Sequence, residues 1–222
     1  MTIRPVHEGD RPTVEWLTTK LWGAPEVVVH DGAFYPAALP GFIAERAGRI
    51  AGLVTFDVRP PVLEIVTINA LDQWSGIGTM LIEAIRAEAK RRGCHEVMLT
   101  TTNDNIGALR FYQRRGFRLA AIRPGAVDRS RQLKPEIPRT GDFGIPLRDE
   151  IDLSCPVLGK IPNKYPERTR ADSLAPTVIP WSLTGSEISY FTRRVCLCAV
   201  VNPPDALYKD YDCPREHDAA NR

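Results

Sequence analysis

A β-branched apolar run, a glycine turn and a long amphipathic helix follow one another directly between residues 62 and 92. The run is VLEIVTINA (62–70), the turn contains Gly76 and Gly78, and the helix carries apolar residues at helical spacing until Gly93. β-Branched residues favour strands, apolar residues at i, i+4 and i+7 favour a helix, and glycine just past the last turn ends one. The segment therefore predicts a strand, a tight turn and a helix.

The same alternation of strands and helices continues on both sides of this segment. A helix that Asp10 is placed to cap is predicted over residues 11–22, and the turn Ala47-Gly48 predicts a hairpin. Further strands are expected near residue 2 and at 95–102, 117–123 and 145–153, with a second long helix at 106–115 and a charged excursion at 124–144. Strands that first form hairpins and then alternate with helices indicate an α/β fold with a mixed sheet.

The character of the sequence changes after residue 154. Residues 155–222 contain eight prolines, four of the five cysteines and no clear helical or strand period. We predict one folded domain over residues 1–154 and a C-terminal extension over 155–222 with little fixed structure. A small capping element on the main domain is the alternative for the extension.

Composition excludes several classes of function. The net charge of +2 is too small to indicate a nucleic-acid partner. No apolar run reaches the about 18 residues of a membrane span, and the N-terminus has no apolar core of a signal peptide. No Cys or His spacing predicts a metal site. We therefore expect a cytoplasmic protein without a metal, a membrane anchor or a nucleic-acid partner.

The glycine turn favours a phosphate ligand. Gly76 and Gly78 let a ligand approach the backbone closely, and the unpaired N–H groups at the start of the helix suit a pyrophosphate. Gln73 and Thr79 add polar side chains. A plain strand–helix connection is the alternative. A P-loop is excluded because no lysine follows the glycines, and a dinucleotide fingerprint because Leu81 replaces its third glycine.

The order of motifs resembles the GNAT family of N-acetyltransferases over residues 2–153. The resemblance rests on the Q-x-x-G-x-G turn and on an asparagine followed seven residues later by a tyrosine in NIGALRFYQRRGF, namely on Gln73, Gly76, Gly78, Asn105 and Tyr112. It implies a single domain whose twisted sheet is mixed but mostly antiparallel, has about six to seven strands and is flanked by helices.

The resemblance further implies acetyl-CoA as the donor and an amine of a small molecule or a protein as the acceptor. The implied donor-binding residues are the strand residues Ile68, Asn69 and Ala70, the turn residues Gln73, Trp74, Ser75, Gly76, Ile77, Gly78 and Thr79, and Asn105. Asn105 would contact the CoA arm, Tyr112 would face the sulfur, and the protein would be a monomer or a homodimer.

Amine acetylation requires a base and an acid. An alkyl amine with a pKa of about 10.4 is mostly protonated at neutral pH, so a base must remove a proton. Glu64, a carboxylate inside an apolar strand, is the candidate base, and Tyr112 is the candidate acid for the leaving sulfur. A backbone N–H near Ile68 or Asn69 is the candidate oxyanion donor. Their structural alternatives are a solvated strand residue for Glu64, core packing for Tyr112 and a helix N-cap for Asn105.

The sequence predicts the reaction type better than the acceptor. The first predicted helix with the loop after it, residues 21–41, and the segment 124–144 are candidate walls of the acceptor site. The excess of basic residues in the second segment favours either an anionic acceptor or simple solvation. His7 and His30 have no partner at a recognisable spacing and receive no role. The predicted function is an acetyl-CoA-dependent N-acetyltransferase. The alternative is a CoA-binding sensor or interaction module, which would need the turn but neither Tyr112 nor Glu64.

Overall fold

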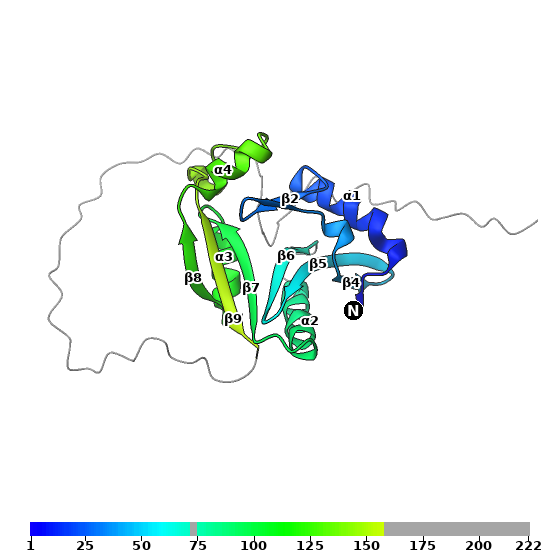
Figure 1. The fold of residues 1–222 in the computed structure, drawn as a ribbon. Helices are drawn as coiled ribbons and strands as arrows, with labels where there is room; N and C mark the ends of the chain where they lie inside the picture. The colour runs from blue at the N-terminus through cyan, green and yellow to red at the C-terminus, as the bar shows by residue number, and fades with distance from the viewer. Residues whose placement is uncertain (72–74, 158–222) are drawn as a thin grey trace, which may run out of the picture.

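The computed structural model describes residues 1–71 and 75–157, which form a seven-stranded sheet with helices on both faces (Figure 1). In spatial order the strands are β1 (Thr2–Pro5), β4 (Gly41–Arg46), β5 (Arg49–Arg59), β6 (Val62–Ala70), β7 (Glu96–Thr102), β9 (Glu150–Pro156) and β8 (Arg118–Arg123). Neighbouring strands are antiparallel except for the parallel pair β6 and β7. The predicted α/β fold with a mixed, mostly antiparallel sheet is confirmed.

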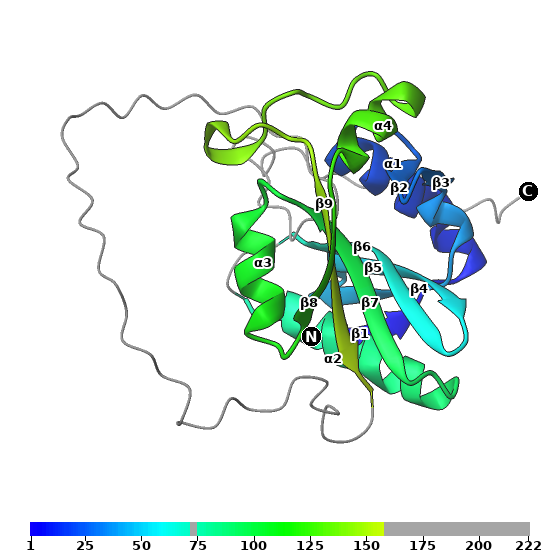
Figure 2. The same cartoon turned by 60° about the vertical axis from the view of Figure 1, so that its left-hand side comes forward.

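The helices form two layers around the sheet. The elements outside the sheet are α1 (Arg11–Trp22), α2 (Ile77–Arg91), α3 (Ile106–Gln113), α4 (Ala126–Leu133) and a hairpin of β2 (Val27–Val29) and β3 (Gly32–Phe34). α2 and α3 lie on one face, and α1, the hairpin and α4 lie over the other (Figure 2). Among the described residues, no helix is both long and apolar enough to cross a membrane.

The apolar face of α2 explains why this helix is the main cover of the sheet. Ile77, Leu81, Ile82 and Ile85 are all buried and belong to the core between α2, α3 and the sheet. Each fully buried aliphatic side chain of this size contributes roughly 1.5–3 kcal/mol of transfer free energy. The helix ends before Gly93, whose φ of +70° is the left-handed conformation that glycine adopts without strain.

A bulge in β6 changes the direction of this strand. β5 and β6 pair in regular register until Thr55 faces Thr67, but the next rung joins Phe56 to Ile65, so Val66 is the extra residue on β6. An extra residue of this kind bends a strand and increases its twist. The bulge lies one residue beyond the last rung that β6 shares with β7, which is Ile65 with Leu99.

Two segments that the sequence predicted as loops contain regular structure. Residues 21–41 include the β2–β3 hairpin, and residues 124–144 include α4. The final strand begins at Glu150 instead of residue 145 and continues to Pro156, two residues past the predicted domain boundary at 154. Residues 158–222, most of the predicted extension, lie outside the described residues.

The predicted capping role of Asp10 is wrong in its detail. Asp10 directly precedes α1, but its side chain makes no hydrogen bond to the first turn of that helix. Its carboxylate instead accepts the backbone N–H of His7 at 2.8 Å and pairs with the guanidinium of Arg4 at 2.7 Å. Asp10 therefore joins the entry of α1 to strand β1, and Pro12 in the first turn is compatible with the missing cap.

Candidate active site

The parallel strands β6 and β7 separate in the middle of the sheet. Their ladder ends at Ile65 and Leu99, although β6 continues to Ala70 and β7 to Thr102. We call this divergence the fork; residues 66–70 of β6 and 100–102 of β7 bound it. Figure 1 shows β5 and β6 leaning away from β7 and β9 above the point where the ladder ends.

The predicted donor-binding residues of β6 line one arm of the fork. Ile68 and Ala70 are buried against the core beneath α2. Asn69 points to the opposite face and is 2 % exposed, and its Oδ1 has no hydrogen-bond partner. A buried amide oxygen without a partner costs roughly 1–3 kcal/mol. Asn69 is therefore a site at which a bound molecule with an N–H group would gain a hydrogen bond.

The turn that leads into α2 keeps part of its backbone open. Gly76 is exposed, has a φ of +82°, and no atom lies within 4 Å of the position that a Cβ would occupy. Ser75 is half-buried, and Ile77 is buried in the core. Gln73 and Trp74 lie outside the described residues. The described part of the turn thus leaves the N-terminal end of α2 accessible at Gly76.

Gly78 and Thr79 join α2 to α3. A Cβ on Gly78 would lie 2.9 Å from Cζ of Phe111, so close packing of the two helices requires glycine here. The hydroxyl of Thr79 accepts hydrogen bonds from Nε and Nη2 of Arg115 at 3.0 and 2.5 Å. Arg115 also stacks its guanidinium over the ring of Phe111, 3.6 Å from the centroid. Both residues at the start of α2 therefore have a packing role as well as their predicted binding role.

Asn105 and Tyr112 lie at the two ends of α3. Asn105 caps this helix, because its Oδ1 accepts the backbone N–H of Ala108 at 3.0 Å. Tyr112 is completely buried on the α2 side of the sheet, where its ring meets Phe111 and Phe117 edge-on at centroid distances of 5.2 and 5.6 Å. The capping and packing roles that the sequence left open for these residues are both present.

Glu64 lies at the base of the fork on the face that is opposite to Tyr112. Its Oε1 is 3.1 Å from Nε2 of His30, which reaches across from the tip of the β2–β3 hairpin. The same Nε2 is 3.0 Å from Oγ1 of Thr100, the first β7 residue beyond the shared ladder. The hydrogen bond with Glu64 is the main reason that the pKa of His30 is raised above its usual value.

The polar contacts continue along the sheet from Thr100 to β9 and β8. Thr100 Oγ1 donates to Oδ1 of Asp152 at 2.9 Å, and Nε of Arg123 donates to Oδ2 of the same carboxylate at 2.8 Å. Glu150 lies beside them, is 1 % exposed, and its Oε1 has no hydrogen-bond partner. Burial raises the pKa of the Glu150 carboxyl above its usual range. We call the six residues the fork cluster: His30, Glu64, Thr100, Arg123, Glu150 and Asp152.

The hairpin turn holds His30 in place. His30 and Asp31 have φ values of +54° and +59°, the left-handed conformation of both central residues of a type I′ turn. The backbone N–H of His30 donates to Oε2 of Glu150 at 3.4 Å, and Asp31 pairs with Arg129 of α4 at 3.1 Å. Sequence reasoning missed His30 as a site residue. The signal that could have found it is the sequence VVVHDGAF, in which Asp31-Gly32 follows a β-branched run.

The basic residues of segment 124–144 stabilise the segment itself. Arg131 donates to the backbone oxygens of Ile137, Pro138 and Leu147, and the ammonium of Lys134 donates to the backbone oxygens of Trp22 and Glu26 at 3.1 and 3.3 Å. Burial lowers the pKa of Lys134. The positive charges of Arg131 and Lys134 therefore bind backbone oxygens within the fold. This does not favour the anionic acceptor that the excess of basic residues in this segment suggested.

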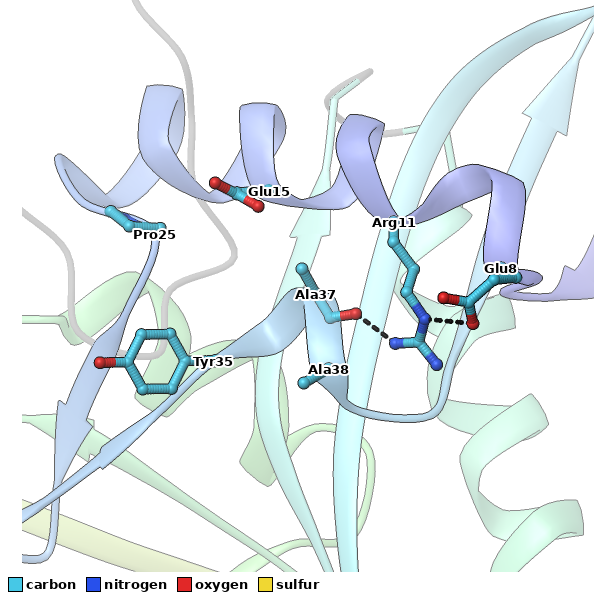
Figure 3. A pocket seen from close by; sticks show the side chains of 7 residues that line it. All are labelled: Glu8, Arg11, Glu15, Pro25, Tyr35, Ala37 and Ala38. Atoms are coloured by element: carbon cyan, nitrogen blue, oxygen red, sulfur yellow. Dashed lines mark hydrogen bonds and ion pairs between the residues drawn. The ribbon is translucent and has the colours of Figure 1, made fainter.

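The first helix and the loop after it, which the sequence predicts as one wall of the acceptor site, border a surface groove. The groove has a volume of about 580 Å³ and is lined by Glu8, Arg11, Glu15, Pro25, Tyr35, Ala37 and Ala38 (Figure 3). Arg11 pairs with Glu8 at 2.7 Å and donates to the backbone oxygen of Ala37. Among the side chains that line the groove, the carboxylate of Glu15 and the hydroxyl of Tyr35 are therefore the polar groups that take no part in the Arg11 contacts.

Within residues 1–71 and 75–157, no group of three or more His, Cys, Asp or Glu side chains is arranged to hold a metal ion. The same two ranges contain two free cysteines, Cys94 and Cys155, and both are buried. Cys94 belongs to the core beneath α2.

Comparison with known proteins identifies relatives of this fold. Residues 10–117 match the family model described as the acetyltransferase (GNAT) family. The uncharacterized protein YdhI of Bacillus subtilis (strain 168) is 39% identical over 155 residues, which are 69% of this chain and 97% of that protein.

Two solved structures share the fold. A GNAT family acetyltransferase from Elizabethkingia anophelis with acetyl-CoA bound is 22% identical, with a TM-score of 0.52 over 70% of this chain and 97% of that chain. A Bacillus subtilis acetyltransferase in complex with CoA is 22% identical, with a TM-score of 0.51 over 70% of this chain and 98% of that chain.

Proposed function

The chain belongs to the GNAT acetyltransferase family, and we propose that it transfers the acetyl group of acetyl-CoA to an amine. In this reaction the acetyl carbon forms a bond to the amine nitrogen and loses its bond to sulfur. The products are an amide, CoA as a thiol, and the proton that the acceptor ammonium gives up. The proposed acceptor is an amine of a small molecule or of a protein.

The fork is the observation that carries this proposal. Where a parallel pair of strands separates within a sheet, a ligand can lie between the two strands, here between residues 66–70 of β6 and residues 100–102 of β7, beyond their last shared rung. The N-terminal end of α2, accessible at Gly76, follows the end of β6 that borders the fork. The unpaired N–H groups of a helix N-terminus favour the negative charge of a pyrophosphate. The two related structures, which hold CoA and acetyl-CoA, are similar in fold and support this ligand.

The fork cluster supports a positively charged acceptor. Three carboxylates, those of Glu64, Glu150 and Asp152, face one guanidinium, that of Arg123, and the imidazole of His30. An acceptor that arrives as an ammonium is attracted by this excess of acidic groups, whereas a phosphate or carboxylate is repelled. Glu64 is the proposed base, because it lies at the base of the fork on the same face as this cluster.

A coupled assay of the full chain tests the proposal. The purified protein is mixed with acetyl-CoA and, in turn, an aliphatic diamine, an amino sugar, and peptides with a free α- or ε-amine. Release of the CoA thiol and the mass of the acetylated product are measured. An alcohol of the same skeleton replaces each amine as the control. We expect turnover with at least one amine and none with the alcohols.

The Glu64→Gln variant separates catalysis from binding in the same assay. We expect a loss of kcat of roughly 100-fold or more, the scale of a missing general base, with acetyl-CoA binding unchanged. Glu83→Gln, which changes an exposed carboxylate of α2, is the matched control. Acetyl-CoA binding without turnover on any amine would contradict the enzyme and favour the sensor or interaction module.

A further inference from the structure

We propose that His30 is a positioning residue for Glu64, holding the carboxylate at the base of the fork through a hydrogen bond from Nε2. This inference rests on the proposed function, because His30 would position the residue that we propose as the base. Nε2 of His30 contacts both strands at the base of the fork. It lies 3.1 Å from Oε1 of Glu64 on β6 and 3.0 Å from Oγ1 of Thr100 on β7. The contact is made by the fold and not by local sequence, since 34 positions separate His30 from Glu64.

The hydrogen bonds around Thr100 show that Nε2 of His30 carries a proton. The single hydroxyl proton of Thr100 is directed to the Asp152 carboxylate, so Thr100 is an acceptor toward His30. The carboxylate of Glu64 is also an acceptor. Nε2 must therefore be protonated and donate to both groups. Asp152, which Arg123 holds in turn, thus fixes Nε2 of His30 as a donor through Thr100.

The other ring nitrogen faces a second carboxylate. Nδ1 of His30 is buried, has no hydrogen-bond partner, and lies 3.8 Å from Oε2 of Glu150. A neutral imidazole would turn a lone pair toward this oxygen, whereas an imidazolium turns an N–H toward it. The raised pKa of His30, caused mainly by Glu64, supports the imidazolium. Asp31 is the remaining charged neighbour in the turn, and Arg129 of α4 pairs with it.

The positioning role has a consequence for turnover. Oε1 of Glu64 is fixed by His30, so the second carboxylate oxygen has a defined direction from which to accept the proton of an ammonium. Without His30, Glu64 can adopt other side-chain rotamers, and misplacement of a catalytic group by about 1 Å reduces the rate by as much as about 100-fold.

A nuclear magnetic resonance titration of the histidine side chains in the full-length protein tests the contact without either substrate. We expect His30 to titrate above the ordinary histidine range and to return toward this range in Glu64→Gln. Exposed His95, which lies outside the fork cluster, is the internal reference. A His30 signal in the ordinary range that Glu64→Gln leaves unchanged would overturn the inference, whether or not the protein is an acetyltransferase.

Two substitutions of His30 test the kinetic role. Asn tolerates the left-handed backbone of this position but is too short to reach Glu64, whereas Gln places an amide donor near the position of Nε2. We expect His30→Asn to reduce kcat by roughly 10- to 100-fold. His30→Gln should recover most of the kcat that His30→Asn loses. His95→Asn is the control with unchanged kinetics.

The outcomes separate the two proposals. If the wild-type protein acetylates an amine and both His30 variants keep its kcat, His30 has no positioning role and the inference fails. If His30→Asn and His30→Gln lose kcat equally, the effect is structural and the inference also fails. If the wild-type protein acetylates no amine, the proposed function fails, and the titration still shows whether His30 and Glu64 interact.

Discussion

Glu64 and Tyr112 lie on opposite faces of the sheet. Glu64 contacts His30 on the face beneath the β2–β3 hairpin, whereas Tyr112 is buried in the core on the α2 side. In the proposed reaction, the base and the acid would therefore act from opposite faces. This arrangement would separate the proton that leaves the amine from the proton that reaches the thiolate.

Tyr112→Phe tests the acid. The substitution removes one hydroxyl and keeps the edge-on ring contacts with Phe111 and Phe117, so the fold should be unchanged. We expect acetyl-CoA affinity within about twofold of the wild type and a loss of kcat of roughly 100-fold, the scale of a general acid. Steady-state kinetics measure the loss. An unchanged kcat would remove Tyr112 from the mechanism.

Gly78→Ala tests whether this glycine serves packing. The new Cβ would lie 2.9 Å from Phe111, whose ring is also held by Arg115, so overpacking should cost about 1–3 kcal/mol of unfolding free energy. A double-mutant cycle with Phe111→Leu measures the interaction by urea unfolding. We expect Phe111→Leu to recover most of the loss. Additive losses in the double mutant would show that Phe111 is not the cause.

Single residues show how far the sequence predicts the site. Glu64 is a candidate because a carboxylate inside an apolar β-branched strand is unusual, and Asn105 because it precedes an amphipathic helix. The hairpin turn of His30 has a signal in the sequence, but its contacts with β6, β7 and β9 have none, because these partners are distant in sequence. The packing role of Gly78 was missed for the same reason, since the turn motif does not reveal the ring of Phe111.

At the scale of elements, α4 was missed because its eight residues include few apolar ones. Val127 is the main buried apolar side chain of AVDRSRQL, and much of the local order comes from Arg131, which donates to three backbone oxygens outside the helix. Such contacts leave no periodic pattern in a sequence. α2, whose apolar face is continuous, was predicted to within one residue at its C-terminal end.

Arg131→Gln tests this dependence of α4 and its surroundings on one guanidinium. We expect the free energy of unfolding to fall by about 2 kcal/mol, because three partly buried carbonyl groups lose donors. Arg129→Gln removes an exposed ion pair on the same helix and should cost less than about 1 kcal/mol. Urea unfolding of the two variants gives the comparison, and equal losses would contradict the assignment.

Glu88 gives α2 a dependence on pH. Hydrogen bonds from Arg91, followed by those from Arg92, lower the pKa of Glu88 from 4.5 to about 2. A lowered pKa stabilises the fold above the unfolded value and loses this effect as the pH falls toward the folded value. Glu88→Gln should therefore cost about 1 kcal/mol at neutral pH and progressively less below about pH 4.5.

Unfolding curves at neutral and acidic pH measure this change for Glu88→Gln. Glu83→Gln, which alters a more exposed carboxylate of the same helix, should have little effect at either pH. A cost for Glu88→Gln that stays constant from neutral to acidic pH would show that its ion pairs do not stabilise α2.

At the scale of the whole molecule, β9 completes the sheet. It lies between β7 and β8, and the backbone N–H of Val157 donates to the backbone oxygen of His95 at 2.9 Å. We predict that a chain ending at residue 157 folds and binds acetyl-CoA like the full chain. A chain ending at residue 149 should not fold, because β8 loses its neighbour. Circular dichroism and thermal unfolding distinguish these outcomes, and aggregation of the 157-residue chain would show that later residues cover part of the core.

A calorimetric titration of the full-length protein with acetyl-CoA, CoA and ATP tests most directly whether the fork and the N-terminal end of α2 form a CoA site. We expect saturable binding of acetyl-CoA and CoA with one site per chain, and no binding of ATP, because the turn lacks the lysine of a P-loop. A folded protein that binds neither CoA form would contradict both the donor site and the acetyltransferase that depends on it.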